Sequence, residues 1–369
     1  MRVAYLLTSL GAGGAERQVL GLARRMAERG HVVKLFVLLP PGSGDLSVDT
    51  TASLFEIVHL NMRKNLLSVA AGMRYGLGEL RRFGPDLVHS HNFHGNIVAR
   101  LLAAVTGTPL ISTIHNVYEG GWLRMLAYRL TDSLSCRTVA VSEAARERYV
   151  RLGAVSAAKS GVIANGIEME AFTPDPVRRV KSRAALGAGG DFLWIAVGRV
   201  VPAKDYPNLL RALAQVRGAG ASVKLVVAGA GGYAYAEQLR ELGRSLGLGE
   251  SVQWLGLRGD LPALLDAADG FVLSSAWEGM PLALGEAMAM EKPVVATDVG
   301  GVRELVGPGA LLVPAGDSEA LAGAMLRVMR LGLLEREVIG RAGRERILEG
   351  FDMDAQALKW EQAYRAAVL

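Results

Sequence analysis

Two carboxylates stand eight residues apart in an otherwise apolar segment, Glu278 and Glu286 of Glu-Gly-Met-Pro-Leu-Ala-Leu-Gly-Glu. Desolvating an ionised carboxylate is costly unless a partner compensates it, so the pair indicates either a bound ligand or cationic neighbours. Pro281 suits the first position of a helix, where its missing N–H has no consequence. We therefore expect Glu278 in the loop before that helix and Glu286 in its second turn.

The start of this helix offers backbone N–H groups beside the two carboxylates. The free N–H groups of Met280, Leu282 and Ala283 would point to one place. Carboxylates accept hydrogen bonds from hydroxyl groups, and a helix N-terminus attracts anions. The combination predicts a polyhydroxylated ligand that carries phosphate. The structural alternative is that Glu278 caps the helix and Glu286 pairs with an arginine.

Two cations follow another apolar run, in which Val197-Gly198-Arg199 is followed five residues later by Lys204. At the carboxyl end of a buried strand, two such cations could neutralise a diphosphate. A surface loop with two basic residues explains the spacing equally well.

A glycine-rich stretch, Gly11-Ala-Gly-Gly-Ala15, follows the first apolar run and precedes a helical pattern. Glycines allow the backbone to approach a phosphate closely, and a helix N-terminus favours the anion. The stretch is not the dinucleotide fingerprint, because Glu16 stands where the third glycine is required. A tight turn is the alternative interpretation.

Histidines gather at the ends of two predicted strands, His89, His91 and His94 after one and His115 after the next. Zinc requires three or four convergent ligands, usually with acidic or cysteine company, whereas these residues stand beside Ser and Asn. The pattern favours hydrogen bonds to a substrate, or loop orientation, over metal binding. His31 and His59 are interpreted as structural.

Motifs of several other enzyme classes are missing from the sequence. There is no G-x-S-x-G elbow, no Cys–His arrangement and no Gly-x4-Gly-Lys-Ser/Thr loop. Basic segments lack the interleaved aromatic residues of nucleic-acid binders. Serine or cysteine hydrolysis, P-loop chemistry and nucleic-acid binding are therefore disfavoured.

Apolar runs and amphipathic stretches alternate along the whole chain, which predicts an α/β fold of parallel sheets covered by helices. Predicted strands are 3–8, 32–39, 86–90, 110–114, 138–142, 192–198, 223–229, 252–255, 270–274 and 293–297, and predicted helices include 15–29, 66–83, 206–217, 233–246, 317–331 and 353–369. A break at 165–190 divides the series, which predicts two Rossmann-like domains. Ligands bind beyond the carboxyl ends of such strands, so a crevice between the domains is the expected site.

Length and composition bound the class of protein. A chain of 369 residues, 50% hydrophobic and 21% charged, is typical of two folded domains. The single cysteine, Cys136, excludes an intramolecular disulfide and suits a reducing cytosol. Residues 1–15 predict a strand and a glycine loop rather than a secretory signal. Arg100 interrupts the most apolar candidate for a membrane span, 97–112.

Charge is distributed unevenly. Residues 1–165 hold 19 Lys/Arg and 11 Asp/Glu, a net +8, whereas the remainder holds 22 and 25, a net −3. The asymmetry indicates an anionic partner for the first half, or simply a solvated surface. Basic residues in and just before the helix predicted at 66–83 are compatible with docking on an anionic membrane or with burial on the sheet: Arg63, Lys64, Arg74, Arg81 and Arg82.

The motifs, taken in order, resemble those of the retaining glycosyltransferases of the GT-B fold, specifically family four. The segments that carry the resemblance are Gly-Gly-Ala-Glu-Arg at 13–17, Val-His-Ser-His at 88–91, Val-Ser-Glu at 141–143, Asn-Gly-Ile-Glu at 165–168, Val-Gly-Arg with Lys204, Val-Ala-Gly-Ala-Gly at 227–231, Leu-Gly at 255–256, Glu-x7-Glu at 278–286 and Asp-Val-Gly-Gly at 298–301. They cover nearly the whole chain. One departure is Ala164, where the family usually has proline before Asn-Gly.

The resemblance implies two facing Rossmann-like domains with a deep cleft between them. Residues 1–165 would bind the acceptor, 166–352 the nucleotide sugar, and helix 353–369 would cross back to the first domain. It implies metal-independent transfer of a hexose, with retention, from a UDP- or GDP-sugar to a saccharide or lipid-linked acceptor, without a cofactor. The setting implied is cytoplasmic synthesis of cell-envelope polysaccharide, lipopolysaccharide or glycolipid, with peripheral contact to the inner face of the plasma membrane.

The resemblance also implies residue roles. Arg199 and Lys204 would bind the donor diphosphate, Glu278 the sugar hydroxyls and Glu286 the ribose, while His115 would lie near the transferred sugar. Further donor contacts would come from Gly13, Gly14, Gly198, Gly279, Met280, Pro281, Leu282 and Ala283, with Arg258 at the base, and acceptor contacts from His91, Asn92 and Asn116; no residue would hold a metal. A nucleotide-sugar epimerase or hydrolase of the same fold, or a non-catalytic binding protein, is the alternative.

Overall fold

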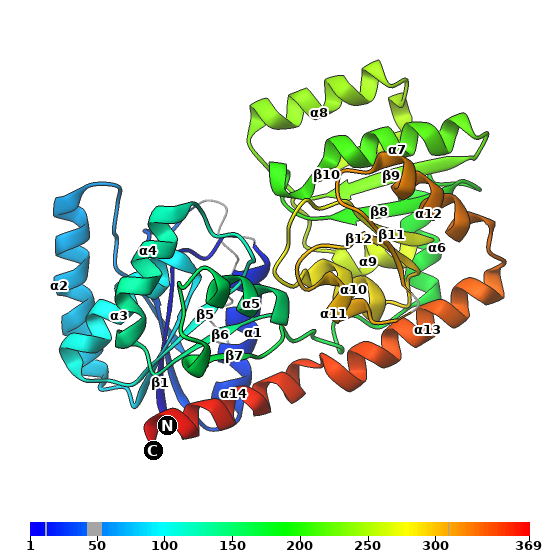
Figure 1. The fold of residues 1–369 in the computed structure, drawn as a ribbon. Helices are drawn as coiled ribbons and strands as arrows, with labels where there is room; N and C mark the ends of the chain where they lie inside the picture. Colours follow the sequence, from blue (N-terminus) through cyan, green and yellow to red (C-terminus); the bar gives the residue numbers. More distant parts are fainter. Residues whose placement is uncertain (12, 43–53, 309) are drawn as a thin grey trace. The chain divides into compact units, whose positions relative to one another are not determined.

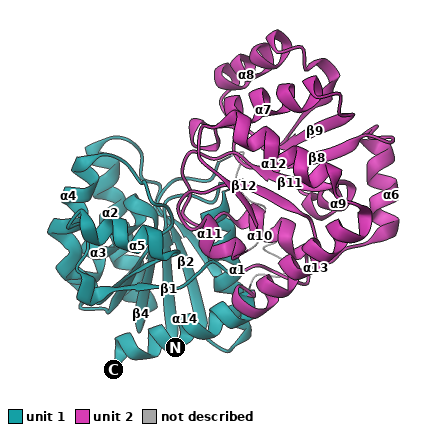
Figure 2. Cartoon of the chain, turned by 45° about the vertical axis from the view of Figure 1, so that its right-hand side comes forward, with its two compact units in different colours: residues 1–166, 353–369 teal, residues 167–352 magenta. Residues whose placement is uncertain are grey.

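The computed structural model describes residues 1–11, 13–42, 54–308 and 310–369, which form two compact units. Unit 1 comprises Met1–Gly166 and Met353–Leu369, and unit 2 comprises Ile167–Asp352 (Figure 2).

Unit 1 is built on a parallel sheet whose described strands lie in the order β3-β2-β1-β4-β5-β6-β7. The strands are β1 (Arg2–Leu7), β2 (Val32–Val37), β3 (Glu56–His59), β4 (Leu87–His91), β5 (Leu110–Ile114), β6 (Arg137–Ala140) and β7 (Ser160–Val162). This order is the Rossmann arrangement, in which the direction of winding reverses between β1 and β4.

Helices cover both faces of this sheet (Figure 1). They are α1 (Gly14–Glu28), α2 (Leu66–Phe83), α3 (Asn92–Thr106), α4 (Trp122–Thr131), α5 (Glu143–Arg151) and α14 (Met353–Val368). Because side chains alternate along a strand, Tyr5 and Leu7 share a core with α1 and α14, whereas Ala4 and Leu6 share one with α2 and α3.

The C-terminal helix α14 belongs to unit 1, as expected for a helix that crosses back to the first domain. The Tyr364 hydroxyl lies 2.9 Å from that of Tyr5 and 2.6 Å from Nδ1 of His89. The other ring nitrogen of His89 is 2.7 Å from the Thr113 hydroxyl. His89 is fully buried, so the interpretation that it faces a substrate is wrong and its role is to join β4 to α14.

Unit 2 repeats the same winding with strands in the order β10-β9-β8-β11-β12-β13, all parallel. The strands are β8 (Phe192–Val197), β9 (Val223–Ala228), β10 (Val252–Gly256), β11 (Gly270–Leu273), β12 (Val294–Thr297) and β13 (Leu311–Val313). The helices are α6 (Pro176–Ala185), α7 (Tyr206–Gly218), α8 (Tyr233–Ser245), α9 (Leu261–Ala267), α10 (Leu282–Ala289), α11 (Val302–Val306), α12 (Ser318–Arg330) and α13 (Leu333–Gly350). Winding reverses between β8 and β11.

The predicted strands all occur within two residues of their expected bounds, and the predicted helices within one. Three short strands at sheet edges were not predicted, namely β3, β7 and β13. The break expected at 165–190 contains helix α6, which was not predicted from the sequence. Asp175 caps α6 by accepting hydrogen bonds from the backbone N–H groups of Val177 and Arg178. In the described residues, no helix combines the length and apolar character that a membrane span requires.

Candidate active site

In unit 2, the loops that follow β8 and β11 lie side by side, because these two strands are neighbours at the point where winding reverses. The carboxyl ends of such strands are where open α/β sheets bind ligands. The loop after β8 carries Arg199 and Lys204, and the loop after β11 carries Glu278. Three of the residues predicted to bind the donor therefore come from one edge of one sheet.

Lys204 and Glu278 form an ion pair, with the lysine Nζ 2.5 Å from Oε1 of the carboxylate. The Ser275 hydroxyl donates to the same oxygen at 2.6 Å. Glu278 is only 7% exposed, so the lysine compensates a carboxylate that would otherwise be costly to bury. Oε2 of Glu278 accepts no hydrogen bond from any residue that the structure describes, which leaves it available to a hydroxyl group.

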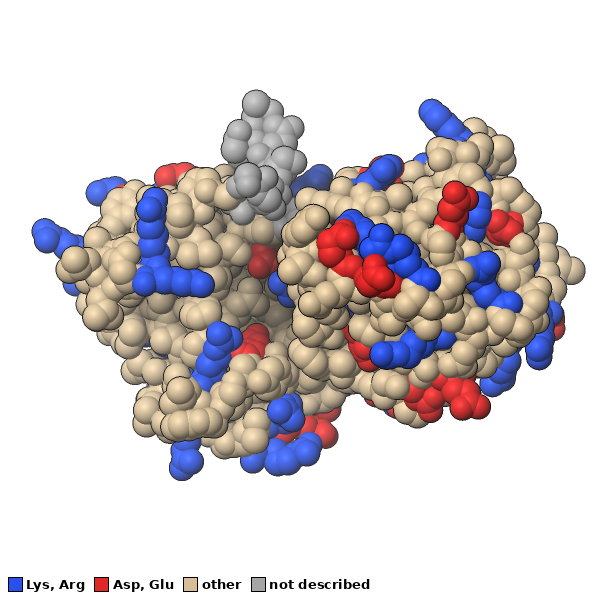
Figure 3. Space-filling view, turned by 90° about the horizontal axis from the view of Figure 1, so that it is seen from above, with Lys and Arg blue, Asp and Glu red and all other residues tan. Residues whose placement is uncertain are grey.

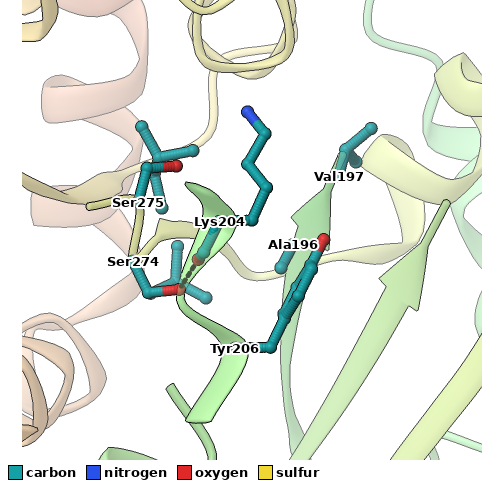
Figure 4. Close-up of a pocket in the computed structure, with 8 residues that line it drawn as sticks. Ala196, Val197, Lys204, Tyr206, Ser274 and Ser275 are labelled. Carbon is teal, nitrogen blue, oxygen red and sulfur yellow. Dashed lines mark hydrogen bonds between the residues drawn. The ribbon is translucent and has the colours of Figure 1, made fainter. Parts of the chain in front are cut away.

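Backbone contacts fix the two loops against each other. The Ser274 hydroxyl donates to the Lys204 carbonyl at 2.8 Å, and the Ala276 N–H donates to the Ala203 carbonyl at 2.9 Å. Figure 4 shows the first of these bonds, from which the Lys204 side chain extends between Ser275 and Val197. These two hydrogen bonds hold the backbone at Lys204 in place, and the lysine amine therefore lies next to the Glu278 carboxylate.

Glycines allow the loop after β8 to lie close to the neighbouring loop after β9. A Cβ added to Gly229 would lie 1.9 Å from the Gly198 carbonyl oxygen, and one added to Gly231 would lie 2.0 Å from that of Val200. A Cβ on Gly198 would come within 2.9 Å of the Lys204 side chain. Close approach of the two loop backbones therefore requires glycine at 229 and 231, and Gly198 leaves space for the Lys204 side chain.

Arg199 differs from Lys204 in having an exposed side chain. Its guanidinium makes no hydrogen bond or ion pair with any residue in the described part of the chain. A cation on the loop that carries Lys204, with no hydrogen-bond or ion-pair partner among the described residues, is suited to an incoming anion.

The segment after Glu278 runs into α10, which begins at Leu282 with Pro281 as its N-cap. The expectation that Pro281 is the first helical residue is therefore wrong by one position. Pro281 provides no side-chain cap. Among the described residues Glu278 bonds to Lys204 and Ser275 and to no N–H group of α10, which contradicts the structural alternative that Glu278 caps this helix. The side chains of Met280 and Leu282 are buried, so only their backbone can serve a ligand.

Two further parts of this segment are fixed by the sheet. The Gly301 N–H donates to the Gly279 carbonyl at 2.8 Å, which ties the loop after β12 to the loop that carries Glu278. Glu286 is the fifth residue of α10 and is 5% exposed. It therefore lies in the second turn, as predicted.

Arg258 lies on the loop after the edge strand β10, two strands away from β8. Its guanidinium is paired with the Asp260 carboxylate at 2.6 and 2.8 Å, and both side chains are exposed. The structure does not bring Arg258 to the Lys204–Glu278 pair.

In unit 1 the corresponding edge of the sheet carries glycines and histidines. Gly13 is the N-cap of α1 and Gly14 its first residue, so both follow β1 as predicted. His91 is the N-cap of α3, and Asn92 begins that helix with a φ of 62°, a left-handed conformation that asparagine tolerates better than most residues. Asn116 lies in the loop after β5.

His91 and His115 are in contact, with Nδ1 of the first 3.0 Å from Nε2 of the second. The outer nitrogens, Nε2 of His91 and Nδ1 of His115, are buried without a hydrogen-bond partner among the described residues. Burial lowers the pKa of His115 to about 4, so the ring is neutral at pH 7.

Glu119 of this region was not among the residues predicted from the sequence. Its carboxylate accepts a hydrogen bond from the His115 N–H at 3.3 Å and one from the Tyr128 hydroxyl at 2.7 Å. Burial raises its pKa to about 7. A lone glutamate in a loop gives no pattern in a single sequence, and only the fold shows that it fixes the loop of His115. Within the described residues, no group of three His, Cys, Asp or Glu side chains is arranged to hold a metal ion.

Comparison with known proteins agrees with this geometry. Residues 12–171 match the model of Glycosyltransferase Family 4, and residues 178–346 match that of Glycosyl transferases group 1. The D-inositol 3-phosphate glycosyltransferase of Kineococcus radiotolerans is 30% identical over 97% of this chain and 91% of its own length. The chain belongs to the family 4 glycosyltransferases. It is therefore a transferase with the GT-B fold.

Other relatives of this glycosyltransferase differ in the substrates that their names record. An Escherichia coli UDP-Gal:alpha-D-GlcNAc-diphosphoundecaprenol alpha-1,3-galactosyltransferase is 27% identical over 76% of this chain and 75% of its own length. Among solved structures, Anabaena Alr3699/HepE in complex with UDP and glucose superimposes with a TM-score of 0.89 at 23% identity, over 99% of this chain and all of that one. The last likeness concerns the fold alone.

Proposed function

We propose that this glycosyltransferase transfers a hexose, with retention of anomeric configuration, from a UDP-sugar to a lipid-linked or oligosaccharide acceptor. The observation that carries the proposal is the cluster of Lys204, Glu278 and Ser275, with Arg199 unpaired on the same loop. It provides two cations for a diphosphate and one carboxylate oxygen for a sugar hydroxyl, at the edge of the sheet where ligands bind.

The chemistry follows from these groups. The bond between the anomeric carbon and the diphosphate oxygen breaks, and the acceptor hydroxyl oxygen forms the new bond to that carbon from the same side. The acceptor proton passes to the departing phosphate oxygen. Arg199 and Lys204 stabilise the charge that develops on the diphosphate, a preorganised electrostatic effect that lowers the barrier. No protein nucleophile is required.

The two glutamates would bind different parts of the donor. Oε2 of Glu278 accepts from a sugar hydroxyl while Oε1 stays with Lys204 and Ser275, and Glu286 accepts from the ribose. The uncapped start of α10, Leu282 and Ala283, donates its backbone N–H groups to phosphate or sugar oxygens. We propose that these contacts and the two cations bind the diphosphate without a divalent metal.

Residues of unit 1 complete the proposed set. We propose that the backbone of Gly13 and Gly14 donates to the diphosphate, and that neutral His115 donates to the transferred sugar. His91, Asn92 and Asn116 are proposed to contact the acceptor. Arg258 would reach the base only after leaving Asp260, so its role is the least supported by the geometry.

The choice of UDP over GDP rests on relatives. The Escherichia coli relative is named for UDP-Gal and a diphosphoundecaprenol acceptor, and the Anabaena structure holds UDP and glucose. The inositol phosphate relatives show that acceptors vary within the family. We propose a lipid-linked acceptor in cell-envelope synthesis, and action at the inner face of the plasma membrane.

A direct assay tests the proposal. The protein is incubated with UDP-glucose or UDP-galactose, with and without a diphosphoundecaprenol-linked sugar, in the presence of a chelator. We expect UDP release that depends on the acceptor, and an α-linked product. UDP release without acceptor would favour the hydrolase, and recovery of a rearranged donor sugar would favour the epimerase. A product of inverted anomeric configuration, or a strict requirement for manganese, would overturn the mechanism.

A further inference from the structure

The segment at the end of β12, residues 297–301, has no part in the proposed chemistry, although it contains the Asp-Val-Gly-Gly motif. Strand β12 pairs with β11, so the segment lies beside the loop that carries Glu278. Thr297 is the last residue of β12 and is fully buried. A buried hydroxyl requires a hydrogen-bond partner, and the partner of Thr297 lies in the loop of Glu278.

The segment holds this loop on both sides of the carboxylate. The Thr297 hydroxyl donates to the Ser275 carbonyl at 2.7 Å. The Gly301 N–H donates to the Gly279 carbonyl at 2.8 Å. Glu278 stands in the chain between these two anchored carbonyls, so the segment fixes the path of the backbone that carries it.

The contact of Thr297 fixes one peptide group, the one between Ser275 and Ala276. Its carbonyl accepts from Thr297, and its N–H donates to the Ala203 carbonyl at 2.9 Å. A peptide group bonded at both polar ends cannot rotate without losing a hydrogen bond. It therefore sets the position of the Ser275 Cβ, from which the hydroxyl donates to Oε1 of Glu278 at 2.6 Å.

The acidic residue of the motif has a different partner. Asp298 is exposed and forms an ion pair with Arg303, which is also exposed. Acidic and basic side chains lie next to each other at several places on the face of the molecule drawn in Figure 3, and exposed pairs of this kind contribute little to stability. Thr297, and not Asp298, is therefore the polar side chain of the segment that is hydrogen-bonded to the loop of Glu278.

We propose that Thr297 is a positioning residue for sugar transfer, which acts through the Ser275–Ala276 peptide group on the carboxylate of Glu278. Loss of the Thr297 hydroxyl takes a donor from a buried carbonyl, so the peptide group turns towards another partner and the Ser275 hydroxyl leaves Oε1. The carboxylate, and the Lys204 amine paired with it, then lose their fixed placement at the donor sugar. The inference rests on the proposed function, because it assigns Thr297 to the donor site proposed there.

A double-mutant cycle in the full chain tests the proposal. The readout is kcat/KM for acceptor-dependent UDP release, with UDP-glucose or UDP-galactose and a diphosphoundecaprenol-linked sugar. Thr297→Val removes the hydroxyl at similar side-chain volume, and Ser275→Ala removes the hydroxyl on which it acts; each should lower kcat/KM about 5-fold. Because the two residues act in series, the double variant should also lose about 5-fold rather than about 25-fold.

Three further variants separate positioning from stability. Thr297→Ser keeps the hydroxyl, so its kcat/KM should stay within about 2-fold of the wild type. Val295→Ala leaves a cavity in the core of unit 2 on the same strand, so it should lower Tm without changing kcat/KM at temperatures well below Tm. Asp298→Asn removes the exposed pair with Arg303 and should change neither quantity.

Three outcomes would overturn the proposal: Thr297→Val is as active as the wild type, Thr297→Ser is as impaired as Thr297→Val, or the two losses combine to about 25-fold. Failure of the proposed function is distinguishable, because the wild type itself would then release no UDP in the presence of the acceptor. In that case the cycle is measured by Tm. The decreases caused by Thr297→Val and Ser275→Ala should again not add, and additive decreases would show that Thr297 does not act through Ser275.

Discussion

The two sheets share the strand order around the reversal of winding, but the loops at their carboxyl ends carry different chemistry. In unit 2 the loops at the reversal of winding carry Lys204 paired with buried Glu278, and Arg199 on the same loop as Lys204. In unit 1 the equivalent edge carries the His91–His115 pair, and Glu119 lies against the backbone of His115. The edge in unit 2 therefore carries charged side chains. In unit 1, burial disfavours the charged forms of His115 and Glu119.

The difference shows that the fold determines where a site lies but not what it does. In both sheets, reversal of winding separates two loops at the carboxyl ends of neighbouring strands, where ligands bind. The side chains on those loops determine which chemistry is possible. An ion pair with an unpaired cation nearby suits an anionic leaving group, whereas neutral rings suit hydrogen bonds to an uncharged sugar or acceptor. The following variants test that division of roles.

The largest effect is expected from Lys204→Ala. Loss of a cation that stabilises the leaving diphosphate should lower kcat/KM roughly 10²- to 10³-fold. It also leaves Glu278 buried without its cation, so Tm should fall. Steady-state transfer and thermal unfolding measure both effects.

The control for this variant is Lys224→Ala, which removes another lysine–carboxylate pair of unit 2. Lys224 lies 3.5 Å from Asp191 near the amino end of β9, away from the loops that carry the site. Activity of the control should stay within a few-fold of the wild type. If Lys204→Ala behaved like the control, the charged edge would not be the site of transfer.

Arg199→Ala should separate catalysis from stability. The Arg199 side chain has no hydrogen-bond or ion-pair partner in the described part of the chain, so its removal breaks no such interaction and Tm should not change. The loss of one charge-assisted contact to the diphosphate should reduce kcat/KM roughly 10- to 100-fold. Unchanged kinetics would remove Arg199 from the site.

A smaller effect is expected from Ser275→Ala. The Ser275 hydroxyl donates one hydrogen bond to Oε1 of Glu278, at 2.6 Å, and Lys204 remains in place. Loss of one such bond corresponds to about a 5-fold decrease in kcat/KM. A loss as large as that of Lys204→Ala would mean that the serine, and not the lysine, positions the carboxylate.

The histidine edge should respond to pH instead. Burial raises the pKa of Glu119 to about 7, above its ordinary value of 4.5. The folded protein therefore holds a proton that the unfolded chain releases, so the stability contributed by Glu119 is complete below pH 4.5 and is lost as pH rises through 7. Burial lowers the pKa of His115, so its effect on stability has the opposite pH dependence. The stability that neutral His115 contributes is lost as pH falls below 6.5.

Glu119→Gln isolates the first of these contributions, because glutamine does not ionise; its Oε1 can accept from the His115 N–H while its amide N–H donates to the Tyr128 hydroxyl. The Tm of the variant relative to the wild type should increase by about 5 °C between pH 5 and pH 8. A difference that does not vary with pH would show that Glu119 titrates as an ordinary carboxyl group.

The sequence revealed most of the fold because the central strands are buried on both faces and read as apolar runs. The strands β3, β7 and β13 were missed because they have only three or four residues and are half-exposed at sheet edges. The helix α6 was missed because Pro176 and its polar residues resemble a linker, although Asp175 and Pro176 are also a good helix start.

The candidate site could be proposed from the sequence where its residues stand in recognisable spacings, as Arg199, Lys204 and Glu278 do. The pairing of Lys204 with Glu278 joins positions 74 residues apart and depends on β8 and β11 being neighbours. Ser275 and Glu119 gave no signal, because a single serine or glutamate in a loop is not a pattern. The burial of His89 under α14 could not be predicted either, because it depends on the contact of Tyr364 with His89 in the folded protein.

Calorimetric titration of UDP into the wild type and into Arg199→Ala/Lys204→Ala tests the central claim, that the charged edge of unit 2 binds the donor diphosphate. The two cations should together account for most of the affinity, so we predict that the double variant binds UDP at least roughly 100-fold more weakly. Equal affinity of the double variant and the wild type for UDP would contradict the account.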